Sequence, residues 1–136
     1  MKRIAVSANT DELDNVLDFV NTELDFHGFP SEAMADIDLA VEEVFVNISS
    51  YAYESQNGEV VLYISVSENE ATLRFEDSGK PFNPLEVPAP DLDKPLMERD
   101  IGGLGILFVK QVMDEVLYSY SGGKNILTMK KGGCDN

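Results

Sequence analysis

The sequence predicts an α+β fold, a two-layer sandwich in which a mixed, mostly antiparallel sheet is covered on one face by helices. Three observations lead to this prediction. Two stretches in the first third of the chain carry apolar residues at helical spacing. Short runs rich in β-branched and aromatic residues come in pairs, each joined by a few polar residues or glycines. A third helical stretch lies between the two pairs.

The first element is a strand over residues 2–8, because these residues are rich in Ile and Val and alternate weakly. The polar residues 9–11 then favour a helix N-terminus. In the helix that follows, apolar residues recur every three or four positions: Leu13, Val16, Leu17, Val20 and Leu24. His27 and Gly28 end it, since a His suits the negative end of a helix and Gly suits the residue after it.

The second helix begins after Pro30, with Ser31 as its predicted N-cap. Its apolar stripe consists of Met34, Ile37, Val41, Val44 and Ile48. Each helical residue advances by about 100°, so Glu43 and Asn47 lie one turn apart along the edge of this stripe. Both polar side chains are therefore expected at the border of the core.

The remaining elements are two hairpins with a helix between them. Residues 59–67 and 71–76 form the first hairpin, joined by a polar connection. A helix over residues 104–114 comes next. Residues 116–121 and 125–130 form the last hairpin around a Gly-Gly pair.

Composition limits the protein class. With 136 residues, 43% of them apolar, the chain 1–136 is expected to be a single domain with one core. One cysteine, Cys134, cannot form an internal disulfide, and the chain shows no signal-peptide pattern, so a cytoplasmic protein is expected. The net charge of −15 argues against direct binding to nucleic acid or an anionic membrane. It is compatible with a basic protein partner and equally with a role in solubility alone.

Two segments indicate a nucleotide site. In the first, an apolar strand runs into an Asp77-x-Gly79 turn and cannot continue, because Pro81 and Pro84 lack a backbone donor. About twenty residues with further prolines follow, a length that favours a lid over a ligand. In the second segment, the glycines of 102–105 open a helix, where backbone N–H groups suit phosphate oxygens.

The glycine cluster matches neither a Walker-A loop nor a dinucleotide fingerprint. Taken alone, it is equally consistent with a tight turn and close helix packing. The combination with Glu43-x-x-x-Asn47 and Asp77-x-Gly79 is more specific. It resembles the N, G1 and G2 boxes of the GHKL (Bergerat-fold) ATPases and, more narrowly, the anti-sigma-factor serine kinases of bacteria. The resemblance runs from about residue 38 to residue 131.

The resemblance implies a role for each motif residue, with ATP and Mg²⁺ as cofactors. Asn47 would be the Mg²⁺ ligand, Glu43 the general base for an attacking hydroxyl, and Arg99 a contact to the γ-phosphate when the lid closes. Asp77 would accept the adenine amino hydrogens. The remaining nucleotide contacts would come from Gly79, Pro81, Phe82, Gly102, Gly103, Leu104 and Gly105.

The chain departs from the family pattern at two places. Many relatives carry a His soon after the N-box Asn, whereas Tyr51 and Tyr53 stand in that neighbourhood here. Lys124-Asn125 stands where a small hydroxyl residue is expected beside the base. The sequence therefore leaves that wall of the pocket unassigned.

Four functions are compatible with the sequence. The resemblance implies a serine/threonine protein kinase and anti-sigma factor, which binds a sigma factor and phosphorylates an anti-anti-sigma antagonist. The resemblance is also compatible with a homodimer. The alternative is a nucleotide-gated binding module without significant kinase activity, but retention of Glu43 favours the kinase. A histidine kinase catalytic domain is less favoured, because it would need a phosphoacceptor His on a dimerising hairpin and this sequence shows neither that hairpin nor a second His. The fourth reading is an unrelated acidic interaction domain.

Overall fold

The computed structural model describes residues 1–49, 58–67, 69–81, 83 and 108–133. The elements in chain order are β1 (Lys2–Ser7), a 3₁₀ turn η1 (Thr10–Glu12), α1 (Leu13–Phe26), α2 (Ser31–Asn47), β2 (Glu59–Ser67), β3 (Glu70–Asp77), β4 (Glu115–Ser121) and β5 (Lys124–Gly132). Residues 108–112, which precede β4, are helical.

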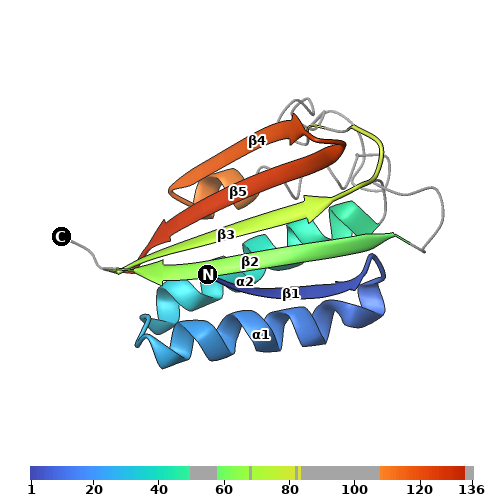
Figure 1. Cartoon of the computed structure of the whole chain (residues 1–136). Coiled ribbons are helices and arrows are strands. Elements are labelled where there is room, and N and C mark those ends of the chain that lie inside the picture. The colour runs from blue at the N-terminus through green and yellow to red at the C-terminus, as the bar shows by residue number, and fades with distance from the viewer. Residues whose placement is uncertain (50–57, 68, 82, 84–107, 134–136) are drawn as a thin grey trace, which may run out of the picture.

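The five strands form one sheet in the order β1-β2-β3-β5-β4 (Figure 1). Both predicted hairpins are present, and the last hairpin joins the sheet by pairing β5 with β3. All four pairings are antiparallel, so the prediction of a mostly antiparallel sheet is confirmed. No parallel pair occurs among the described strands.

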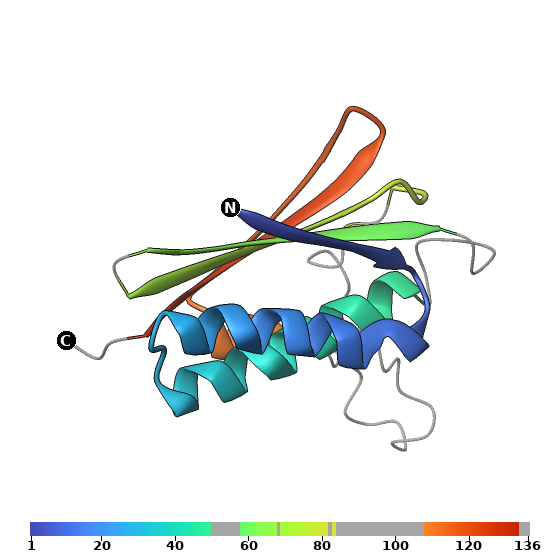
Figure 2. The ribbon, with the colours of Figure 1, turned by 60° about the horizontal axis from the view of Figure 1, so that its bottom comes forward.

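The helices pack on one face of the sheet, which confirms the predicted two-layer sandwich (Figure 2). The strands explain why, because their buried residues alternate, as in β3, where Ala71, Leu73 and Phe75 are buried. From the helices, the apolar stripes fill the space opposite: Val16, Val20 and Leu24 of α1, and Ile37, Val41, Val44 and Phe45 of α2.

The predicted helix starts are partly confirmed. Asn9 does act as a cap, since its Oδ1 accepts the Asp11 N–H at 2.9 Å, but the residues that follow form η1 before α1 begins. Ser31 is not the N-cap of α2. The N-cap is Pro30, whose carbonyl already accepts the Met34 N–H at 3.0 Å. Proline fixes its own φ near the value that helix entry needs, so Ser31 becomes the first helical residue.

The end of α1 is as predicted. His27 is the C-cap and Gly28 follows with a φ of +71°, a conformation that glycine adopts without strain. His27 has a specific partner, because its Nε2 lies 3.1 Å from Oε1 of Glu23. Lys2 of β1 reaches the other oxygen of the same carboxylate at 3.3 Å.

The third helix ends earlier than predicted. Its described part covers residues 108–112, whereas the sequence predicted a helix to Asp114. Asp114 has already joined the sheet, since its N–H donates to the Lys130 carbonyl at 2.9 Å and its Oδ2 accepts the Gly132 N–H at 2.6 Å. The Met113 N–H still makes a helical bond to the Val109 carbonyl at 3.0 Å, so the contacts of Asp114 to β5 replace only the end of the predicted helix.

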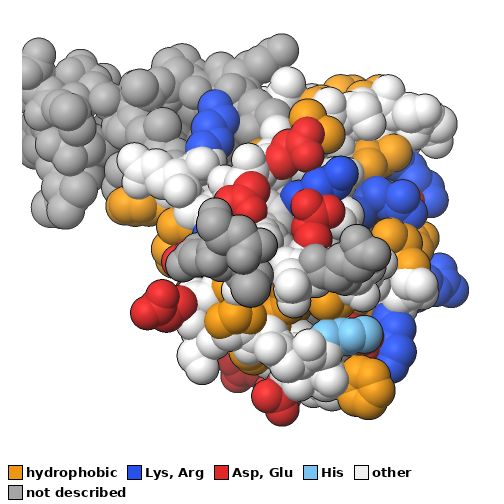
Figure 3. All heavy atoms as spheres, turned by 90° about the vertical axis from the view of Figure 1, so that its left-hand side faces the viewer, with side chains coloured by type: hydrophobic (Ala, Val, Ile, Leu, Met, Phe, Trp, Pro, Cys, Tyr) orange, Lys and Arg blue, Asp and Glu red, His pale blue; other side chains and the backbone are white. Residues whose placement is uncertain are grey.

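Charge is distributed unevenly over the two layers. The sequence has no Lys or Arg between residues 4 and 73, and this stretch includes both long helices. On the open face of the sheet, by contrast, strand alternation places Arg3, Arg74, Lys124 and Lys130. Figure 3 shows Lys and Arg gathered mainly over that side of the molecule.

Within the described ranges, no helix is long and apolar enough to cross a membrane.

Candidate functional site

Asp77 is the centre of the site. It is the last residue of β3, where it pairs with Val60 of β2 on one side and with Asn125 of β5 on the other. Strand alternation turns its side chain toward the helices, in line with Leu73 and Phe75, and only 5% of the residue is exposed. A carboxylate this deeply buried requires hydrogen-bond donors.

The first donor comes from the turn that follows β3. The Gly79 N–H donates to Asp77 Oδ1 at 2.9 Å, which closes the local turn that an Asp-x-Gly sequence favours. Gly79 is itself buried, whereas Pro81 is exposed. The turn that the sequence predicted at the end of this strand is therefore present.

The second donor is Asn125, which the sequence left unassigned. Its Nδ2 donates to Asp77 Oδ1 at 3.0 Å and to the Lys80 carbonyl at 2.9 Å, and its Oδ1 accepts the Tyr118 hydroxyl. A backbone carbonyl can only accept, so the Lys80 contact fixes which end of the amide faces the turn. Asn125 therefore ties β5 to Asp77 and to the chain that follows it.

These contacts set the orientation of the Asp77 carboxylate. Both of its described hydrogen bonds use Oδ1. With Oδ1 held between the Gly79 amide and the Asn125 amide, Oδ2 is the oxygen that can accept from a ligand. An ionised carboxylate only accepts hydrogen bonds, so this site selects a ligand that presents N–H or O–H donors.

Glu43 and Asn47 lie near the C-terminal end of α2, one turn apart and both half-buried. The neighbouring Val44 and Phe45 are buried in the core and fix this face of the helix. Figures 1 and 2 both place this end of α2 and the end of β3 at the same end of the molecule. The sandwich therefore brings the C-terminal end of α2, which carries the helical pair, and the Asp77 end of β3 to one side of the molecule.

Burial raises the pKa of the Glu43 carboxyl above its usual value, and repulsion from the neighbouring Glu42 carboxylate raises that pKa further. A carboxylate with a raised pKa is a stronger base than an exposed one. General-base catalysis works best when the pKa of the base approaches the working pH. The environment of Glu43 therefore shifts it toward the function of a proton acceptor.

A clamp that the sequence did not predict holds the described helix before β4. Lys131 of β5 donates from Nζ to the Val112 carbonyl at 2.6 Å and lies 3.2 Å from the carboxylate of Asp36 on α2. A cation at the C-terminal end of a helix is favourable because the last carbonyls are unpaired. Lys131 thus links the helix, α2 and the sheet at one point.

Several predicted site residues lie outside the described residues, and their roles stay predictions. These are Phe82, Arg99, Gly102, Gly103, Leu104 and Gly105, together with Tyr51, Tyr53 and the predicted lid. Within the described part of the chain, no group of three or more His, Cys, Asp or Glu residues is placed to hold a metal ion. Asn47, the predicted Mg²⁺ ligand, is among the described residues.

Comparison with known families identifies the class of domain. The family model of the histidine kinase-like ATPase domain matches residues 6–131. This match covers most of the chain, so the chain belongs to the histidine kinase-like ATPase family. The predicted resemblance to the GHKL ATPases is confirmed, and membership of this family implies ATP binding.

Curated relatives are serine-protein kinases by name. The chain is 27% identical over 107 residues to the serine-protein kinase RsbW of Bacillus mycoides, covering 76% of this chain and 67% of that protein. It is 28% identical over 108 residues to RsbW of Listeria monocytogenes, covering 76% and 69%. These relatives support a kinase of this family.

Solved structures share the fold. The RsbU and RsbW domains of Rv1364c from Mycobacterium tuberculosis match with a TM-score of 0.64 at 13% identity, over 97% of this chain and 32% of that one. The histidine kinase domain of a blue-light activated kinase from Erythrobacter litoralis matches with a TM-score of 0.56 at 20% identity, over 94% and 62%. The chain thus spans about a third of the first structure and under two thirds of the second. At these identities the similarity shows a shared fold.

Proposed function

We propose that this protein is an ATP-dependent serine/threonine protein kinase and anti-sigma factor of the cytoplasm. It binds a sigma factor and phosphorylates an anti-anti-sigma antagonist. Family membership and the names of the curated relatives support the kinase part. The observation that carries it is Glu43, a half-buried acid with a raised pKa one turn from the amide of Asn47.

The described residues fit an adenine nucleotide. Asp77 offers a buried acceptor whose Oδ1 is already held by two donors, and the adenine amino group supplies the hydrogen that Oδ2 would accept. Gly79 is part of the same buried turn and brings no side chain into the space beside the base. Asn125 keeps this acceptor in place.

The residues of α2 fit the phosphate end. The Asn47 side chain presents a neutral carbonyl oxygen, which is a suitable ligand for Mg²⁺. Because Mg²⁺ in kinases commonly keeps several waters and phosphate oxygens as ligands, one protein oxygen here is compatible with the metal. When bound, Mg²⁺ ATP supplies the γ-phosphoryl group and a metal ion that offsets its charge.

Glu43 accounts for the proton in the transfer step. The serine or threonine oxygen of the antagonist forms a bond to the γ-phosphorus while the bond from that phosphorus to the ADP oxygen breaks. Glu43 accepts the hydroxyl proton, and ADP leaves with the electron pair of the broken bond. A nucleotide-gated binding module has no need of this base.

The test uses the purified chain with Mg²⁺ and γ-labelled ATP, together with candidate antagonist proteins from the same organism. We expect one candidate to acquire label on a serine or threonine, and a sigma factor to be retained by the chain with nucleotide present. Samples without the chain or without Mg²⁺ serve as controls. If ATP binds and a sigma factor is retained but no candidate is labelled, the binding module is the correct function.

A further inference from the structure

The side-chain amide of Asn125 is committed to contacts within the protein. Its Nδ2 carries two hydrogens and faces three acceptors: Asp77 Oδ1 at 3.0 Å, the Lys80 carbonyl at 2.9 Å and the Gly79 carbonyl at 3.4 Å. Its Oδ1 accepts the Tyr118 hydroxyl, and only 6% of the residue is exposed. The amide therefore acts on Asp77 and on the turn that follows it.

The two oxygens of the Asp77 carboxylate are not equivalent. Each carboxylate oxygen has two lone pairs that can accept hydrogen bonds. Those of Oδ1 accept the Gly79 N–H at 2.9 Å and the Asn125 amide at 3.0 Å. Both described hydrogen bonds of Asp77 use this oxygen, so the carboxylate presents one oxygen, Oδ2, to a base instead of two.

The two common purine bases differ in what they ask of a carboxylate. Adenine presents an amino donor beside a ring nitrogen that accepts, so one acceptor oxygen is enough for it. Guanine presents two adjacent donors, the N1–H and the 2-amino group, which match the two oxygens of an unoccupied carboxylate. Where one oxygen is already filled, a guanine donor stays unpaired, and a buried donor without a partner is costly.

We propose that Asn125 determines the base selectivity of this site, because it fills Oδ1 of Asp77 and so prevents the carboxylate from binding guanine with both oxygens. This rests on the proposed function, in which Asp77 binds the base of the nucleotide. The turn alone is not sufficient, since the Gly79 N–H fills one lone pair of Oδ1 and, among the described donors, Asn125 alone fills the other. The register of β5 against β3 thus sets the selectivity.

The other partners of Asn125 keep its donor on Oδ1. If the amide were turned over, its oxygen would face the Asp77 carboxylate and the Lys80 carbonyl, and three acceptors would lie together. The Tyr118 hydroxyl holds the oxygen at the opposite end. The amide is therefore held in the orientation that the selectivity requires.

The test compares GTP with ITP, because the base of ITP is guanine without its 2-amino group. Each nucleotide displaces a fluorescent ATP analogue, labelled on the ribose, from the purified chain with Mg²⁺. In the wild type, both should bind more weakly than ATP and within about twofold of each other. In Asn125→Ala, Oδ1 regains a lone pair, so GTP should bind about tenfold more tightly than ITP.

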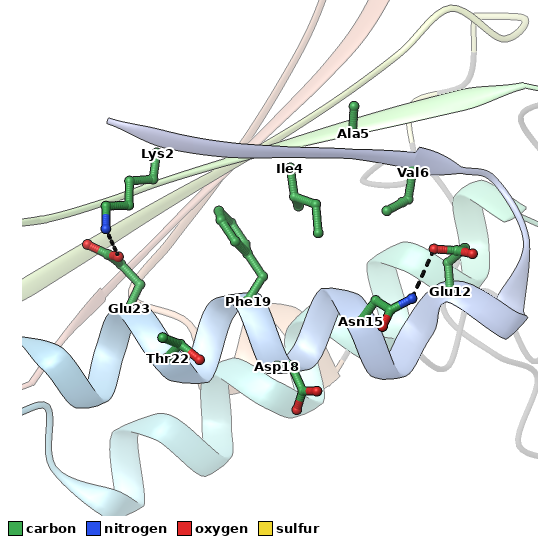
Figure 4. A pocket seen from close by; sticks show the side chains of 10 residues that line it. All are labelled: Lys2, Ile4, Ala5, Val6, Glu12, Asn15, Asp18, Phe19, Thr22 and Glu23. Atoms are coloured by element: carbon green, nitrogen blue, oxygen red, sulfur yellow. Dashed lines mark hydrogen bonds and ion pairs between the residues drawn. The ribbon is translucent and has the colours of Figure 1, made fainter.

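Asn15→Ala is the matched control. It also removes an asparagine amide from a carboxylate, since Asn15 Nδ2 donates to Glu12 Oε2 at 3.2 Å in the groove between α1 and β1 (Figure 4). Neither residue is among the partners of Asp77, so the ratio of GTP to ITP affinity should stay at its wild-type value. Tyr118→Phe controls for loosening of the network, because it deletes a hydroxyl but leaves both amide hydrogens of Asn125. It should keep the wild-type ratio as well.

Asn125→Ser keeps the test valid if Asn125→Ala fails to fold. Serine has one hydrogen to donate and a shorter side chain, so the ratio should shift in the same direction by a smaller factor. Thermal unfolding establishes which variants are folded.

Three results would overturn the proposal while ATP binding remains. One is equal displacement by GTP and ITP in the folded Asn125 variants. Another is a wild type that already binds GTP about tenfold more tightly than ITP, because Oδ1 would then be open. The third is a shift in Tyr118→Phe as large as that in Asn125→Ala, which would assign the effect to loosening. Failure of ATP to displace the analogue from the wild type would instead refute the proposed adenine site, and this proposal with it.

Discussion

Replacing Asn125 with alanine should weaken both the fold and nucleotide binding. The change removes the amide hydrogen bonds to Asp77 at 3.0 Å and to the Lys80 carbonyl at 2.9 Å, and it removes the hydrogen bond that the Asn125 oxygen accepts from the Tyr118 hydroxyl. A hydrogen bond to a charged group contributes about 1.5–3 kcal/mol, and a neutral one about 1 kcal/mol. Because one amide makes these contacts together, we expect a loss of about 2–4 kcal/mol in the free energy of unfolding.

Urea unfolding measures this loss, and titration with ATP measures the effect on the site. The Asp77 carboxylate would lose one of the two donors on Oδ1, so ATP affinity should fall about tenfold as its orientation loosens. Tyr118→Phe deletes only the hydroxyl and should cost about 1 kcal/mol. Tyr120→Phe makes the same change at an exposed tyrosine of the same strand and serves as the control. Wild-type stability and ATP affinity in Asn125→Ala would refute the reasoning.

Three further predictions follow from the same contacts. Asp77→Asn should reduce ATP affinity on the order of 100-fold in titration calorimetry, because two donors hold the amide oxygen at the Oδ1 position and turn its NH₂ toward the base; near-wild-type affinity would remove Asp77 from the site. Burial raises the pKa of Glu43 above its usual 4.5, so the contribution of Glu43 to stability is present below that value and lost as pH rises through the folded pKa. Glu43→Gln should therefore be more stable than wild type at pH 7 and equal to it at pH 3.5, and the opposite trend in urea unfolding would contradict the burial argument. Lys131→Met should lower the free energy of unfolding by about 1–2 kcal/mol and speed amide exchange in residues 108–112. The control is Lys130→Met, which removes an exposed ion pair and should change the free energy of unfolding by about 0.5 kcal/mol or less. Equal effects of the two substitutions would argue against the clamp.

Local patterns predicted the parts of the fold that depend on local physics. The apolar stripe of the second helix placed Glu43 and Asn47 at the edge of the core, because helical period and burial are coupled along one segment. The turn at Asp77 and Gly79 was predictable for the same reason, since its hydrogen bond joins residues two apart. The paired strands and the glycine turn between β4 and β5 also depend on neighbouring residues.

The parts that escaped prediction depend on contacts distant in sequence. Asn125 meets Asp77 only because β5 lies beside β3, and 48 residues separate the two. Lys131 joins the helix over residues 108–112 to Asp36 for the same reason. The third helix ends early because the backbone N–H of Asp114 donates to the Lys130 carbonyl of β5. No local pattern contains these pairings, although the register of β5 against β3, once known, places Asn125 opposite Asp77.

The most direct test of the proposed kinase compares the rate of phosphoryl transfer to the antagonist in Glu43→Gln and Glu42→Gln. Both variants remove one acid from the same turn of α2, but Glu42 is exposed and does not itself accept the proton, because its carboxylate only adds to the burial effect on the pKa of Glu43. We predict that Glu43→Gln keeps its affinity for ATP and its hold on the sigma factor while transfer slows by roughly 10²–10⁴-fold. Glu42→Gln should transfer at close to the wild-type rate. Transfer by Glu43→Gln at the wild-type rate would show that Glu43 is not the base and would contradict the proposed mechanism.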